Sequence, residues 1–179
     1  MVKARAKSGA EAATLSVDLL EAADFYAALD DANDPVWANH TPGTRDLVSR
    51  LKILGSKLVR PAILSGMKKL STAEFEKLLR VLEVIVVRWQ VVGEGRTGTI
   101  ERVSARLAQQ IWDCAVTDRA EIVTSLAELN TTDEEFVAKF ILQENLTKQK
   151  AVYLLKRIED HVRGSTMGQS GKGLEPSAN

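Results

Sequence analysis

One stretch of the sequence, LSTAEFEKLLRVLEVIVVRWQVV at residues 70–92, constrains the fold more than any other. A half-buried strand would need apolar residues at every second position, and this stretch does not keep that period. Ser71 and Glu74 have the spacing of a capping box, so we predict that a helix begins there. The apolar residues recur at separations that place them on one face of that α-helix, namely Phe75, Leu78, Leu79, Leu82, Ile85, Val86 and Trp89.

The other segments carry signals of the same kind. Thr41 and Gly55 are suited to cap and to end a helix, and Pro61 to begin another. Thr132 and Glu135 have the spacing of a second capping box. No hairpin signal of the Asn-Gly type occurs. We therefore predict an all-α protein, with one domain of about eight helices over residues 11–163 and flexible termini.

The two ends of the chain differ from its middle. Residues 1–10 are basic and show no periodicity, so we expect a flexible lead-in. Residues 164–179 are rich in glycine, serine and other polar residues and have too little apolar content to fold. We predict that this second segment is a disordered linker.

The stretch GEGRTG at residues 93–98 matches the glycine fingerprint of phosphate-binding loops, and Asp118 supplies the acid expected about 20 residues later. That fingerprint works only where a strand feeds the loop and a helix follows it. Because the preceding segment is helical, we expect Gly93 and Gly95 to end that helix in left-handed conformations. Thr97 or Thr99 would then cap the next helix.

Three tryptophans are candidates either for base stacking or for the core. Trp89 lies on the apolar helix face described above, and Trp112 shares a second apolar face with Ile111. We expect both in the core. Trp37 follows Asp34-Pro35, and the sequence alone leaves its position open.

The reactive residue types are scarce. The single cysteine, Cys114, excludes an internal disulfide and fits a reducing compartment. His40 and His161 are far apart and belong to no zinc-ligand set or catalytic triad. We therefore expect no catalytic residue, no metal, no cofactor and no enzymatic activity in this chain alone. No apolar run approaches the roughly 18 residues of a membrane span, and the start lacks a signal-peptide core, so we expect a cytoplasmic protein without membrane contact.

The net charge is zero, but the charges are sorted along the chain. Residues 11–34 contain seven acids and no base, and residues 43–69 contain seven bases and one acid, Asp46. Either the basic block faces a nucleic-acid backbone, or the two blocks pack together and neutralise each other. The candidate nucleic-acid contacts are Arg45, Arg50, Lys52, Lys57, Arg60, Lys68 and Lys69, together with Arg96 beside the glycine loop.

The order of segments resembles a known family. DPVWANHTPGTRDLVSRLKILGSKLVRPAILSGM is followed by RWQVVGEGRTGTIER and later by KAVYLLKRIEDH. This succession, over residues 15–163, is similar to the helical region of GmrSD-type restriction endonucleases. In that family the helical region follows a ParB-like nuclease domain marked by an Asp-Gly-Gln-Gln-Arg motif, and a His-Asn-His-type nuclease comes after it.

This sequence contains neither set of catalytic residues. The resemblance therefore implies a non-catalytic helical connector of a phage-defence endonuclease, expected to be part of a longer protein. Its implied partners are the nuclease domains of that protein and the DNA backbone. A function of another class fits the sorted charges as well, namely a free-standing protein–protein interaction module whose acidic first helix meets a basic partner.

Overall fold

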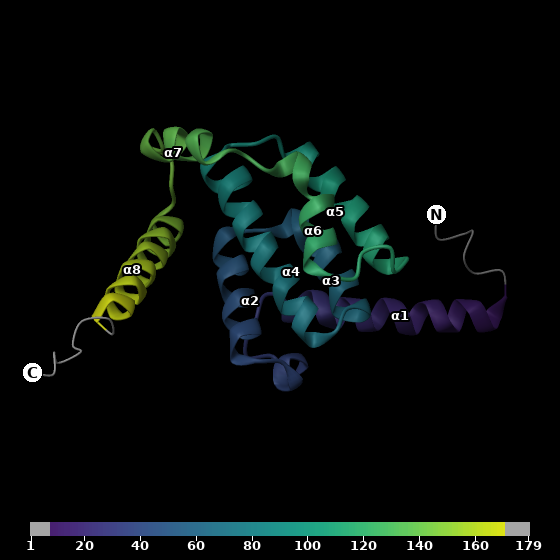
Figure 1. Cartoon of the computed structure of the whole chain (residues 1–179). Coiled ribbons are helices and arrows are strands. Elements are labelled where there is room, and N and C mark those ends of the chain that lie inside the picture. Colours follow the sequence, from purple (N-terminus) through teal and green to yellow (C-terminus); the bar gives the residue numbers. More distant parts are fainter. Residues whose placement is uncertain (1–7, 171–179) are drawn as a thin grey trace, which may run out of the picture. The chain divides into compact units, whose positions relative to one another are not determined.

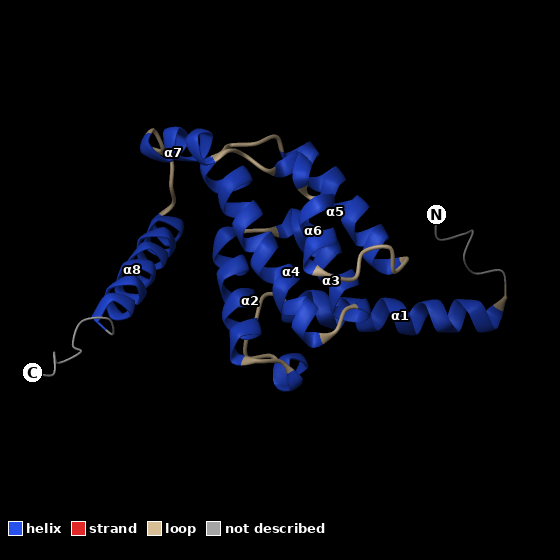
Figure 2. Cartoon of the chain, in the orientation of Figure 1, coloured by secondary structure: helices blue, strands red, loops and turns tan. Residues whose placement is uncertain are grey.

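The protein is described from a computed structural model that covers residues 8–170, with side chains to residue 164. The described residues form eight α-helices and no strand (Figure 2), which confirms the predicted all-α class. The chain divides into two compact units, Met1–Leu142 and Gln143–Asn179. None of the described helices is both long enough and apolar enough to cross a membrane.

The first unit contains seven of these α-helices and four shorter helical segments. The α-helices are α1 (Gly9–Ala28), α2 (Pro42–Leu54), α3 (Arg60–Lys69), α4 (Thr72–Ile85), α5 (Thr97–Trp112), α6 (Arg119–Ser125) and α7 (Asp133–Ile141). Three 3-10 turns, η2 (Pro35–Asn39), η3 (Lys57–Val59) and η5 (Ala127–Leu129), and a π-helical segment, η4 (Val86–Val92), lie between them. The second unit contains α8 (Lys148–Ser170).

Within the first unit, α3 packs on α5 and on α4, and α4 packs in turn on α2 and α6 (Figure 1). The predicted apolar face is buried along α4, but its last predicted member, Trp89, lies in η4 and is only half-buried. The buried residues of α4 on this face are Phe75, Leu78, Leu79, Leu82 and Ile85, and Val86 continues the same face.

The predicted start and stop signals act as expected at most positions. Thr41 caps α2 by accepting a hydrogen bond from the backbone N–H of Thr44, and Gly55 ends the helix at φ 73°. Thr132 and Glu135 form a complete capping box on α7. Ser71 caps α4, but the carboxylate of Glu74 pairs with Lys77 instead of closing that box.

Trp37, whose position the sequence left open, is completely buried. Its indole N–H donates to the carbonyl oxygens of Ala28 and Asp31, each at 3.0 Å. Its ring stacks on Phe75 at a centroid distance of 6.5 Å, and the His40 ring meets it edge-on. Trp37 therefore ties the end of α1 to α4.

Both predicted helix boundaries at the termini shift outward. Helix α1 begins at Gly9, inside the predicted lead-in 1–10, because Ser8 and Glu11 form a capping box. Helix α8 runs to Ser170, past the predicted linker start at residue 164, because an existing helix gains one hydrogen bond for each residue that it adds. The rest of these predicted segments, 1–7 and 171–179, lies outside the described residues.

Two predictions for the glycine loop are wrong: Gly93 does not adopt a left-handed conformation, and no threonine caps α5. Gly93 has φ −73°, and the left-handed residue is Glu94 at φ 49°. Glycine is needed at 93 because a Cβ there would lie 2.4 Å from the carbonyl oxygen of Arg88. Helix α5 has Arg96 at its N-cap without a side-chain hydrogen bond, so neither predicted threonine caps it. Asp118 forms a capping box with Glu121 on α6.

Candidate interaction surfaces

The predicted basic block is largely engaged within the first unit. Arg60 is buried and pairs with Asp30 at 2.5 Å, with its guanidinium 4.5 Å from the Tyr26 ring centroid. The hydrogen bond from Arg60 lowers the pKa of the Asp30 carboxyl. Lys52 donates to the Asp30 backbone carbonyl at 2.6 Å, and Lys68 pairs with Glu21. Residues of the acidic block thus hold three of the candidate cations, two of them through ion pairs.

Three more candidates have partners of other kinds. Arg50 bridges Asp46 at 2.6 Å and Glu83 at 3.0 Å. Arg45 donates to the backbone carbonyls of Trp37 and Ala38 at the end of η2. The ammonium of Lys69 lies 4.7 Å from the Trp112 ring centroid. These contacts argue against a free basic face, but ion pairs between the two charge blocks are formed only by Arg60 and Lys68 among the candidate cations of the described chain.

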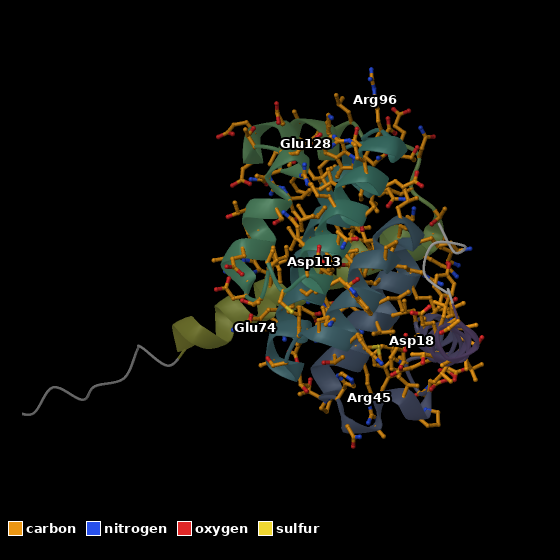
Figure 3. All side chains as sticks on the ribbon, turned by 90° about the vertical axis from the view of Figure 1, so that its right-hand side faces the viewer. Asp18, Arg45, Glu74, Arg96, Asp113 and Glu128 are labelled. Carbon is orange, nitrogen blue, oxygen red and sulfur yellow. The ribbon has the colours of Figure 1, made fainter. Side chains whose placement is uncertain are left out.

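Lys57 and Arg96 differ from the other candidates. Among the residues that the structure describes, neither side chain forms a hydrogen bond or an ion pair, and both are exposed. Arg96 lies at one end of the first unit and Arg45 at the other (Figure 3). Arg96 therefore does not form one basic surface with Arg45.

The arginines near the glycine loop do not converge on an anion site. Arg88 pairs with Asp133 at 2.8 Å, and Arg102 and Arg106 pair with Glu128. The loop itself is held by internal contacts, since Lys139 donates to the Gly93 carbonyl at 2.9 Å. The loop is a connection between η4 and α5.

The structure shows one further candidate surface, namely the first half of α1 with its N-cap, residues 8–20. From residue 8 to residue 20 every side chain except Leu15 is exposed, whereas Ala28 and Leu29 at the other end are buried. The helix packs on α3 and η2 only through its later turns, and its first turns extend past them (Figure 1). The exposed part carries large apolar side chains, with Leu19 57% exposed.

A pocket of about 110 Å³ lies where α1 leaves the rest of the unit. Phe25 of α1, Leu64 of α3 and Trp112 of α5 supply its apolar lining, and Asp18 and Lys68 contribute charged side chains. Trp112 is 41% exposed, so the prediction that it is a core residue is wrong. Its neighbour Ile111 fills the core position at the end of α5.

This pocket could not be found in the sequence. Phe25, Leu64 and Trp112 come from three helices and share no local motif. The only sequence feature that indicated α1 as an interaction surface was the acidic block of residues 11–34.

Trp89, the other tryptophan predicted in the core, is half-buried beside the glycine loop.

No group of three or more histidine, cysteine, aspartate or glutamate side chains in residues 8–164 is placed to hold a metal ion. No protein-family model, no curated protein and no solved structure matches this chain.

Proposed function

We propose that this chain is a non-catalytic helical interaction domain that binds a basic amphipathic helix of a partner protein along the first half of α1. The observation that carries the proposal is the exposed apolar surface of that half-helix. A helical stretch of this length is marginally stable in water on its own and normally gains its stability from packing. A partner helix would supply that packing.

Six apolar residues, five in α1 and one at its C-cap, follow the heptad spacing of helix pairs. They recur at alternating separations of three and four, which forms a seam along one side of a helix: Ala12, Leu15, Leu19, Ala22, Tyr26 and Leu29. The later end of this seam lies against the rest of the unit, where Leu29 is buried. Val17 and Leu20 are exposed away from the seam, and a helix that is apolar on several faces is normally covered. The partner helix would continue the packing that α3 begins.

The charge of α1 determines which kind of partner helix can pack against it. The exposed half carries Glu11 and Asp18, and no base occurs between residues 11 and 34. A second copy of α1 would bring acids against acids, which is unfavourable. A helix with lysine or arginine beside its apolar seam has complementary charge. The pocket at the base of α1 offers Trp112 and Phe25 to an apolar side chain of that helix.

A function of this kind is compatible with the resemblance to GmrSD-type endonucleases. The helical region of GmrSD-type endonucleases is itself a non-catalytic domain, and in such a protein the partner helix would belong to one of the nuclease domains. Contact with the DNA backbone, also implied by the resemblance, has less support. Only Lys57 and Arg96 among the candidates are exposed without a paired group in residues 8–164.

The test uses the full chain and two synthetic helical peptides with the same leucine seam, one with lysine at its flanks and one with glutamate. We expect the lysine peptide to bind and its affinity to fall with added salt. Leu19→Asp should weaken binding about tenfold or more, because it puts a charge into the seam. Since Leu19 is exposed, the folded state should persist, as circular dichroism would verify.

Ser16→Asp is the matched control, because it adds the same charge to α1 outside the seam. We expect this variant to bind the lysine peptide at least as tightly as the wild type. Equal binding of both peptides by the wild type, or binding that Leu19→Asp leaves intact, would contradict the proposal.

A further inference from the structure

An apolar groove of about 530 Å³ lies between α4 and the α6–η5 segment. Val81, Val84 and Ile85 line one side, and Val123, Leu126 and Ala127 line the other. Ile85 and Leu126 are buried at its floor, whereas Val84 and Val123 are 53% and 45% exposed on its walls. The groove is therefore open to an incoming side chain, and both walls are apolar.

The two walls share one geometry. On each wall the lining residues are spaced i, i+3 and i+4, which is the spacing of a helical stripe. Helices α4 and α6 pack against each other, so the two stripes run beside one another. Two adjoining stripes with an open trough between them form the seat into which a third helix packs in helix-in-groove recognition.

The rim of the groove is basic. Arg80, Arg119, Thr124 and Asn130 are its polar lining residues, and no carboxylate is among them. Arg80 pairs with Glu76 at 2.6 Å, whereas Arg119 forms no hydrogen bond or ion pair with a residue that the structure describes.

None of the acids on the flanking elements lines the groove. Glu76 pairs with Arg80, and Asp118 caps α6. Glu121 closes the capping box of α6, and Glu128 binds Arg102 and Arg106. Glu83 on α4 pairs with Arg50 on the side away from the groove lining. The charged side chains that line the groove are therefore both cations, and Arg119 is the one that forms no ion pair with a residue that the structure describes.

We infer that this groove binds an acidic amphipathic helix of a partner protein, with apolar anchors at i, i+3 or i+4, and i+7 and with aspartate or glutamate beside them. The anchors would sit between Val84 and Val123, and the carboxylates would meet Arg80 and Arg119. None of the lining residues belongs to α1 or to the pocket at its base.

This partner differs from the partner proposed for α1, because it has the opposite charge and binds a different surface. A chain that binds a basic helix on α1 and an acidic helix between α4 and α6 would join two partners. The two surfaces share no lining residue, so binding at each can be tested, and refuted, independently of the other.

The test measures binding of the glutamate-flanked leucine peptide, labelled with a fluorophore, to the full chain. We expect the wild type to bind it, and Val84→Asp and Arg119→Glu each to weaken binding about tenfold or more. Val137→Asp is the matched control, because Val137 on α7 is 52% exposed and lies outside the groove lining. It should bind as the wild type does, and so should Leu19→Asp.

Several results would overturn the inference. One is that the acidic peptide fails to bind the wild type at low salt. Another is that it binds Val84→Asp as well as it binds the wild type. A third is that the groove takes up a small apolar dye in a manner sensitive to Val84→Asp while no peptide displaces it, which would make it a small-molecule site. Loss of basic-peptide binding in Leu19→Asp would leave this inference untouched.

Discussion

Arg50, a candidate DNA contact in the sequence, is expected to act as a structural cation, and Arg50→Met tests this. The side chains of Arg50 and Glu83 are 13% and 7% exposed, and they are joined at 3.0 Å between α2 and α4. Methionine keeps most of the length of the side chain but removes its charge. The substitution leaves the Glu83 carboxylate buried without its arginine.

The magnitude follows from burial. Breaking a buried ion pair by removing one partner costs about 3–5 kcal/mol, and the slight exposure of this pair favours the lower end, about 3 kcal/mol. With a urea m-value of about 2 kcal/mol/M, the unfolding midpoint should fall by about 1.5 M. Arg50→Met/Glu83→Leu removes both charges and should come within about 1 kcal/mol of the wild type.

Asp46→Asn is the internal control. Asp46 binds the same guanidinium at 2.6 Å, but its side chain is 64% exposed, so its loss should cost less than about 0.5 kcal/mol. Urea unfolding followed by tryptophan fluorescence reports on the first unit, because Trp37, Trp89 and Trp112 all lie in it. If Arg50→Met costs no more than Asp46→Asn, or if the double variant is no more stable than Arg50→Met, the assignment of Arg50 to the structure is refuted.

Three further predictions concern pH, the glycine loop and DNA. Burial, and then the charge of Arg45, lowers the pKa of His40 below 6.5, so the folded state should lose stability as the pH falls below that value. His40→Phe should remove the difference in urea midpoint between about pH 7.5 and about pH 5.5, and an unchanged difference would disprove the role of His40. Gly95→Ala should cost about 1–3 kcal/mol in thermal unfolding, because the new Cβ would lie 2.3 Å from the Trp89 ring, whereas Gly98→Ala, which has open space, should be neutral or slightly stabilising. A Gly95→Ala protein as stable as Gly98→Ala would contradict that account. Any DNA affinity should be independent of sequence and should be lost between about 50 and about 200 mM salt. Lys57→Glu should reduce this affinity more than Lys68→Glu, because Lys68 pairs with Glu21. A larger effect of Lys68→Glu in a binding titration would support the basic block as a DNA-binding surface.

Local signals predicted most of the helices. The apolar face of α4 and the stop at Gly55 depend on residues a few positions apart, so a single sequence contains them. The π-helical segment η4 is not among the predicted features, because the apolar pattern predicts the α-helical period throughout. The α-helical period places Trp89 on the buried face, but with the wider turn Val91 and Val92 are buried and Trp89 is only half-buried.

The candidate site was harder to predict, because its contacts join distant parts of the chain. Arg50 meets Glu83 across 33 residues, and Lys68 meets Glu21 across 47. The charge count correctly identified two opposed blocks, but only the packing of α1 on α3 shows which cations the acids hold. The groove between α4 and α6 depends on two short stripes from separate helices, and each stripe alone looks like an ordinary buried face.

The π-helical turn also limits how many residues can separate α4 from α5. The hydrogen bonds of a π-helix span one residue more than those of an α-helix, so η4 is equivalent to a single-residue insertion within a continuous helix. Deleting one residue there would restore α-helical bonding but rotate everything that follows by about 100°. Gly93 would then move away from Lys139, and Gly95 from the ring of Trp89. The path of the chain into α5 is set by the number of residues in η4 as well as by their identity.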